Sequence, residues 1–126
     1  MTFISANNPV PVSEIGIECS SSDVHAPAVN TAAVVTYAAV KDFKHVITGI
    51  SWSYAGGTPV GGNLKVEDVS GTIVWQIDID QSGPGGFTFP QPKKSAAANT
   101  AMIITLAAGG AGVTGKLNID NHRLEN

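Results

Sequence analysis

The feature that most constrains the fold is an alternation of apolar side chains with small or polar ones, broken at short intervals by glycine. Between Lys44 and Tyr54 the large apolar residues fall on one face of an extended chain, and glycine and serine fall on the other. An α-helix would scatter the same residues around its circumference. The segment is therefore predicted to be a β-strand whose apolar face consists of Val46, Ile50, Trp52 and Tyr54.

Similar segments recur along the chain and predict an all-β fold. In Asn63–Val69, Leu64 and Val66 are expected to face inward, and Lys65 and Glu67 outward. The Ser70-Gly71 pair before the next strand predicts a hairpin. About seven or eight strands with regular turn signals favour an antiparallel β-sandwich or jelly roll. The further strands are expected at Thr31–Ala39, Thr72–Asp80, Phe87–Phe89, Thr100–Ala107 and Val113–Ile119.

Composition supports this class and excludes others. Charged residues make up 13% of the chain, and it holds 14 glycines and 7 prolines among 126 residues. Helical bundles need more Lys, Glu and Arg on their exposed faces, so almost no helix is expected. A formal net charge of −3 argues against nucleic acid as a partner.

Residues 1–30 differ from the rest and are predicted to form an extended N-terminal arm, with the β-domain spanning 31–126. The arm has early prolines and a polar run, Ser20–Asp23, and only Ser13–Cys19 alternates like a short strand. Because prolines favour an extended path, the apolar residues of the arm are expected to anchor it on a partner. These interface candidates are Phe3, Ile4, Val10 and Val12.

The compartment is inferred from what the sequence lacks. A single cysteine, Cys19, excludes a disulfide within the chain. Met1–Pro9 has neither a basic start nor an apolar core, so it does not resemble a secretory signal. No apolar run approaches the roughly 18 residues that a membrane span needs. The chain is expected to be made in a cytoplasm and to have no membrane partner.

Motifs for catalysis or cofactor binding are weak. Gly110–Gly115 matches the dinucleotide fingerprint G-x-G-x-x-G, but it runs into an alternating strand instead of a helix. Asp78 and Asp80 are best explained as a solvated strand face, although paired carboxylates can bind a cation or share acid–base work. The histidines, at 25, 45 and 122, are scattered. We therefore expect no enzyme activity, no cofactor and no metal site.

The aromatic residues are the remaining candidates. Trp52 and Trp75 lie on the apolar faces of their strands and are expected to fill the core, together with Ile50, Ile77, Leu64, Leu106 and Leu117. The alternative role for an indole is to stack on a sugar or a partner chain. Phe87 and Phe89 lie between prolines, so they are predicted to contact another molecule.

Strand-like and glycine-rich segments recur between His45 and Ile119, namely Ile47–Tyr54, Gly61–Asp68, Ile79-Asp80, Gly83–Phe87, Asn99–Gly110 and Val113–Ile119. Together they resemble a family of small bacteriophage virion proteins, some of which are capsid decoration or cement proteins. The resemblance implies a non-enzymatic homotrimer on the outside of the capsid, where it would bind the major capsid protein and stabilise contacts between its subunits. A receptor- or glycan-binding jelly-roll head of a tail fibre is the alternative, and a TNF- or C1q-like signalling domain is a third.

Overall fold

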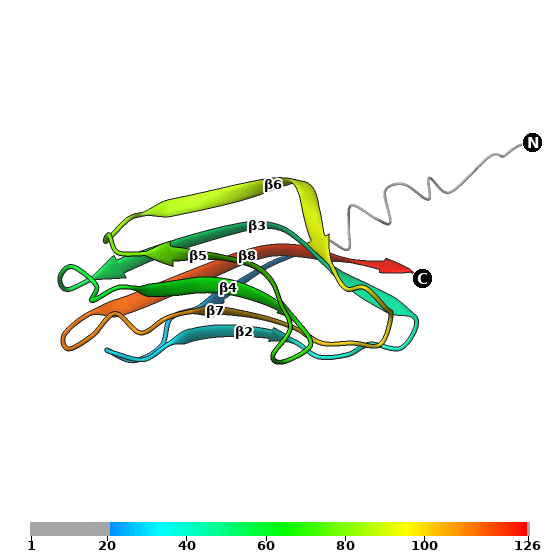
Figure 1. Cartoon of the computed structure of the whole chain (residues 1–126), viewed down its shortest axis with the longest axis horizontal. Helices are drawn as coiled ribbons and strands as arrows, with labels where there is room; N and C mark the ends of the chain where they lie inside the picture. Colours follow the sequence, from blue (N-terminus) through cyan, green and yellow to red (C-terminus); the bar gives the residue numbers. More distant parts are fainter. Residues whose placement is uncertain (1–20, 126) are drawn as a thin grey trace, which may run out of the picture.

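The computed structural model describes residues 21–125, and these residues form strands and connecting loops with no helix. The predicted all-β fold is confirmed (Figure 1). The eight strands are β1 (Ser21–His25), β2 (Ala33–Tyr37), β3 (Phe43–Ala55), β4 (Gly62–Asp68), β5 (Ile73–Ile79), β6 (Gly85–Lys94), β7 (Met102–Leu106) and β8 (Thr114–Glu125).

The strands form two antiparallel sheets that pack face to face as a sandwich. One sheet has the order β1-β8-β3-β6 and the other β2-β7-β4-β5. The sandwich therefore has two long edges (Figure 1). At one edge β1 lies against β2. At the other, aromatic side chains of β5 and β6 meet.

The core lies between the central strands of the two sheets. Of the predicted core residues, Ile50, Trp52, Leu64, Leu106 and Leu117 are buried. Trp75 and Ile77 are only partly buried, because β5 is the last strand of its sheet. An edge strand has no neighbour on one side, so its inward side chains keep some contact with solvent.

The domain begins before residue 31, contrary to the predicted boundary of the arm. Residues Ser21 to His25 pair with β8 in a continuous antiparallel register, from Ser21 opposite Asn121 to His25 opposite Leu117. The polar composition of this segment suggested an arm, but β1 is an edge strand whose polar side chains bond across the sheet. The Ser22 hydroxyl, for example, donates to Asp120 Oδ1 at 2.7 Å. Ser13–Cys19 and the candidates Phe3, Ile4, Val10 and Val12 lie outside the described residues.

The β4–β5 hairpin forms as predicted, but its side-chain pattern changes near the turn. The register between β4 and β5 shifts between Val66 and Glu67, whereas β4 pairs with β7 without a shift. Val66 and Glu67 are both buried, although they lie on opposite faces of the strand. The carboxylate of Glu67 accepts a hydrogen bond from the backbone N–H of Gly71 at 2.7 Å. Glu67 shares the outward face of β4 with Lys65, whose Nζ lies 3.6 Å from Glu67 Oε1. The predicted face is therefore correct, but the turn buries the carboxylate on that face.

β6 and the glycine motif follow the predicted behaviour of their sequences. Pro90 and Pro92 fall in a gap of the ladder between β6 and β3, on the edge of the sheet where proline is tolerated. Gly110–Gly115 leads directly into β8, so the helix that the dinucleotide motif needs is not formed. Nowhere in residues 21–125 is there a helix with the length and apolar character to cross a membrane.

Candidate binding site

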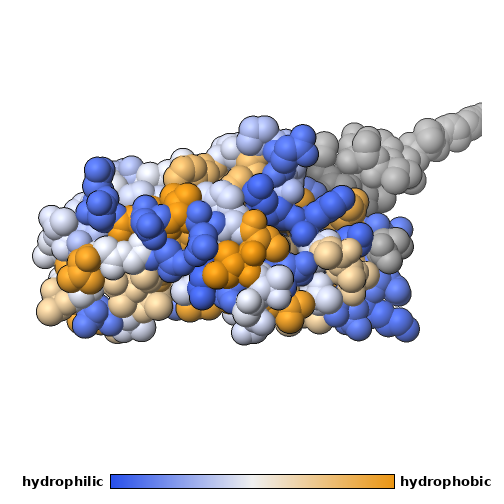
Figure 2. Space-filling view, viewed as in Figure 1, coloured by the Kyte–Doolittle hydropathy of each residue, from blue (hydrophilic) through white to orange (hydrophobic). Residues whose placement is uncertain are grey.

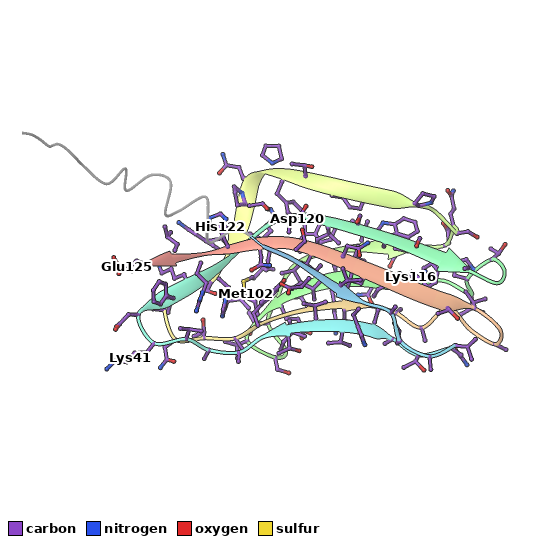
Figure 3. All side chains as sticks on the ribbon, turned by 180° about the vertical axis from the view of Figure 1, so that it is seen from behind. Lys41, Met102, Lys116, Asp120, His122 and Glu125 are labelled. Atoms are coloured by element: carbon purple, nitrogen blue, oxygen red, sulfur yellow. The ribbon has the colours of Figure 1, made fainter. Side chains whose placement is uncertain are left out.

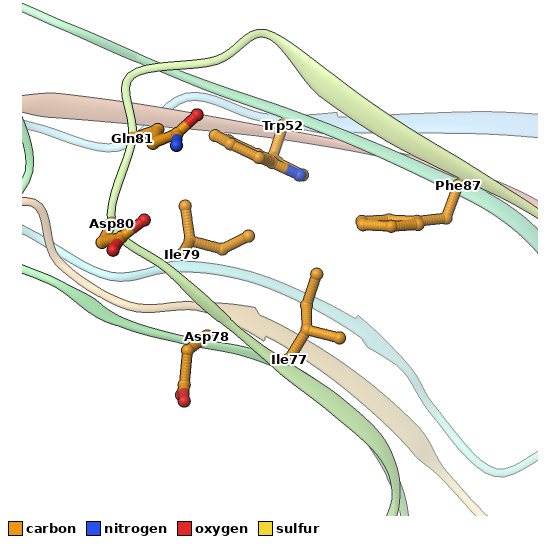
Figure 4. Close-up of a pocket in the computed structure, with 7 residues that line it drawn as sticks. All are labelled: Trp52, Ile77, Asp78, Ile79, Asp80, Gln81 and Phe87. Carbon is orange, nitrogen blue, oxygen red and sulfur yellow. The ribbon is translucent and has the colours of Figure 1, made fainter.

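A pocket of about 250 Å³ opens at the sandwich edge formed by β5 and β6 (Figure 4). β3 contributes Trp52, β6 contributes Phe87, and β5 contributes two inward-facing isoleucines. The segment that leaves β5 supplies Asp80 and Gln81. Apolar walls with a few polar groups at the rim are typical of small-ligand sites.

Two glycines fix the position of Trp52. Trp52 lies opposite Gly85 in the ladder between β3 and β6, and a Cβ added to Gly85 or to Gly83 would lie 2.6 Å from the indole ring. Only glycine lets the backbone approach an indole this closely. The Ser82 carbonyl accepts a hydrogen bond from Tyr54 N at 2.8 Å, which ties the same loop to β3. The loop after β5 therefore covers one part of the indole.

The indole nitrogen of Trp52, a residue that lines the pocket, is a buried donor. Trp52 is 8% exposed, and its Nε1 is buried with no hydrogen-bond partner among the described residues. A buried donor without a partner costs about 1–3 kcal/mol. A ligand oxygen that accepted from this N–H would recover that cost.

An aromatic cluster forms the wall next to the indole. Phe87 is 38% exposed, and its ring meets the edge of Trp75 with centroids 5.4 Å apart. The Phe89 ring also packs against Trp75, with centroids 5.1 Å apart, and Lys93 Nζ lies 5.3 Å from the Phe89 centroid. The predicted contact role of Phe87 and Phe89 stays a prediction, and of the two only Phe87 lines the pocket.

The polar rim is acidic and offers no nucleophile beside a base. Asp78 points away from Trp52 and Phe87, whereas Asp80 and Gln81 lie near the indole (Figure 4). The seven lining residues include no Ser, Cys, His or Lys. Over residues 21–125 no three His, Cys, Asp or Glu side chains gather as a metal site. The carboxylate of Asp80 can accept hydrogen bonds from a ligand, and the amide of Gln81 can both donate and accept them.

The histidines and Gln81 show where the sequence was less informative. His25 accepts a hydrogen bond at Nδ1 from Val34 N at 2.8 Å, and His45 is buried elsewhere in the sandwich. The structure does not bring these two histidines into the pocket. In the sequence Gln81 is only a possible oxygen ligand next to Asp78 and Asp80, and its place beside Trp52 depends on the fold.

The comparisons with known proteins place the chain only loosely. No protein-family model matches the sequence, and no curated protein sequence matches it. Among solved structures it is similar to the family 32 carbohydrate-binding module of C. perfringens NanJ in complex with galactose, with a TM-score of 0.41 and 13% identity. The match covers 84% of this chain and 96% of the module. At this identity and TM-score the ligand of the module does not transfer to this chain.

Proposed function

We propose that this protein is a non-catalytic module that binds a neutral sugar residue of a glycan in the pocket between β3, β5 and β6. The observation that carries the proposal is the buried, unpartnered N–H of Trp52 beside the half-exposed ring of Phe87. A sugar ring presents an apolar C–H face and a rim of hydroxyl groups. An aromatic wall next to an unused donor matches both.

The polar rim extends this match. A hydroxyl oxygen of the sugar would accept from Trp52 Nε1, and other hydroxyls would bond the carboxylate of Asp80 and the amide of Gln81. The two carboxylates of the lining, with no cation among the lining residues, disfavour an anionic ligand. The pocket is smaller than the ~300–1,000 Å³ of most drug-sized ligand sites, so a single sugar residue is the expected occupant.

A glycan array probed with the full chain, followed by calorimetry with the best neutral glycan, tests the proposal. Trp52→Phe removes the donor and keeps an aromatic ring, and Phe87→Ala removes the wall. Each is expected to weaken binding by about tenfold, since 1.4 kcal/mol of lost contact is a factor of ten. Thr88→Ala is the matched control, because Thr88 is the exposed neighbour of Phe87 and does not line the pocket.

Circular dichroism and unfolding curves of each variant separate lost binding from lost folding. Folded Trp52→Phe and Phe87→Ala proteins that bind the glycan with unchanged affinity would show that the pocket is not the site. An array on which no neutral glycan binds would overturn the proposal itself.

Capsid decoration is the second candidate, and exposed aliphatic side chains near the β4–β5 turn favour a protein partner. Val69, Ile73 and Val74 are 44–45% exposed. Figure 2 shows separate apolar areas between hydrophilic side chains on the face it displays. Purified protein that saturates expanded capsids lacking it, at a fixed ratio per capsid subunit, would support decoration. Capsids that take up no protein would refute it.

A further inference from the structure

A second pocket, of about 370 Å³, lies where β1 and β2 meet, at the sandwich edge away from the β5–β6 site. Its walls include the inward-facing Tyr37 of β2, His45 of β3 and two residues near the end of β8, Asn121 and Arg123. It shares no lining residue with the β5–β6 pocket. Six of its eight lining residues are polar or charged, so hydrogen bonds can recognise its ligand.

His45 provides an unused acceptor. Its Nε2 lies 2.7 Å from the carbonyl oxygen of Ala38. Because a carbonyl only accepts, Nε2 carries the proton, and in the neutral ring Nδ1 presents a lone pair. The residue is 4% exposed, and within residues 21–125 Nδ1 is buried with no partner. A ligand hydroxyl group that donated a hydrogen bond to Nδ1 would supply the partner that this nitrogen lacks.

Asp23 provides a second, oriented acceptor. Its Oδ2 accepts from the hydroxyl of Tyr37 at 2.7 Å and from the side-chain amide of Asn121 at 2.7 Å. Two donors on one oxygen fix the carboxylate in the wall of the pocket. Its other oxygen takes part in neither of these bonds, and a second ligand hydroxyl could donate there.

Arg123 provides the donors. Its guanidinium lies 5.3 Å from the centroid of the Phe43 ring, a cation–π contact that leaves the N–H groups of the fork available. Arg123 is exposed and lines the pocket. Its positive charge balances the carboxylate of Asp23, so the pocket selects for neither an anion nor a cation.

We infer that this second pocket binds a neutral polyhydroxylated ligand, whose hydroxyl groups donate to His45 Nδ1 and Asp23 and accept from Arg123. The chemical class is a simple hexose or a smaller polyol, free or at the end of a glycan. The inference does not rest on the β5–β6 pocket. If both sites bind sugars, the module is bivalent, with one site at each edge of the sandwich.

The test uses the full chain labelled with ¹⁵N and titrated separately with D-glucose, D-mannose, D-galactose and glycerol. Binding at the second pocket is expected to move the backbone amide signals of Tyr37, Ala38 and His45. It should also move the ¹⁵N signal of His45 Nδ1 upfield, because the nucleus of a ring nitrogen is more shielded when its lone pair accepts a hydrogen bond. A purely structural His45 would not show that second shift.

Arg123→Ala is the variant that removes the donors from the pocket without opening the core. It is expected to weaken binding of the responding probe by at least about tenfold. Lys116→Ala is the matched control, because Lys116 is an exposed cation toward the other end of the same strand (Figure 3). Equal affinities for the Arg123→Ala and Lys116→Ala proteins would overturn the inference.

The same titration separates this inference from the proposed function. Signals that move only around Phe87 and Gln81 would leave the β5–β6 site standing and refute the second pocket. Signals that move only around His45 would support the second pocket and refute the β5–β6 site. If none of the four probes moves the signals around His45, the second pocket is not a site for this class of ligand.

Discussion

The backbone of Gly85 lies directly against the indole of Trp52. A Cβ at this position would lie 2.6 Å from the ring, a separation that real side chains do not show. The missing side chain is what lets β6 start beside β3, directly against the indole that lines the β5–β6 pocket. The stability of this edge and the shape of the pocket therefore depend on the same glycine.

Gly85→Ala is expected to lower the free energy of unfolding by about 1–3 kcal/mol, the usual cost of forcing extra volume into a packed site. Urea unfolding followed by circular dichroism measures it. Gly86→Ala is the neighbouring control and should cost less, since its nearest contact would be the Ile50 carbonyl oxygen at 3.3 Å. Equal losses of unfolding free energy for the two variants would mean that the Trp52 indole shifts at little cost to make room for the added Cβ.

Glu67→Ala is expected to cost about 1–3 kcal/mol, because it removes a buried charged acceptor from the backbone N–H of Gly71. Glu67→Gln should restore part of the loss, since its amide oxygen can still accept. Lys65→Gln is the control: its Nζ lies 3.6 Å from Glu67 Oε1, a partly exposed ion pair worth under about 1 kcal/mol. If Lys65→Gln costs as much as Glu67→Ala, the ion pair and not the turn contact explains the stabilisation.

Glu67 and β1 show what the sequence could and could not predict. Period two located most of the strands and the inward positions of Leu64, Trp52 and Leu117, because burial on one face demands alternation. The alternation assigns a face but not a degree of burial, so it predicts the outward face of Glu67 without showing that the turn covers its carboxylate. β1 was missed because its polar residues are satisfied by partners distant in sequence, such as Tyr37. Neither pocket was visible for the same reason: strands far apart in sequence build each one.

Leu106→Ala is expected to cost about 2–5 kcal/mol, as for other fully buried leucines. Trp75→Ala should cost less than a fully buried aromatic, because Trp75 lies at the sandwich edge and keeps solvent contact. Thermal and urea unfolding of both variants rank the two losses. A larger loss for Trp75→Ala would mean that the aromatic cluster with Phe87 and Phe89 contributes more than the centre of the core.

Stability is expected to fall in alkaline solution because of two tyrosines. Burial, and then the hydrogen bond to Asp23 and the charges of Asp23 and Asp120, raise the pKa of Tyr37 far above its usual value. Burial also raises the pKa of Tyr54, whose hydroxyl donates to the Ala107 carbonyl oxygen at 2.7 Å. In the unfolded chain both ionise near pH 10, so above that pH the unfolded state binds fewer protons.

The contribution of these tyrosines is therefore complete below about pH 10 and is lost as the pH rises beyond it, by at most about 1.4 kcal/mol per pH unit for each. Urea unfolding between about pH 8 and pH 11.5 measures the slope around the tyrosine pKa. Tyr37→Phe should be less stable at pH 8 but lose stability less steeply above pH 10. An unchanged slope in that variant would assign the alkaline loss to other groups.

The start of the domain can be tested by comparing a chain that begins at Ser21 with one that begins at Thr31. The second lacks β1, which exposes the edge of β8 and removes Asp23 from the hydroxyl of Tyr37 and the amide of Asn121. We expect the Thr31 chain to unfold at lower urea concentration than the Ser21 chain, or to fail to fold, because an unpaired edge and a partly buried phenol without its acceptor both cost free energy. The Asp23→Ala variant of the Ser21 chain separates the two effects. This variant keeps the pairing of β1 with β8 but lacks the hydrogen bonds to Tyr37 and Asn121. If the Thr31 chain unfolds at the same urea concentration as the Ser21 chain, β1 adds nothing to the stability of the sandwich and the boundary near residue 30 is restored.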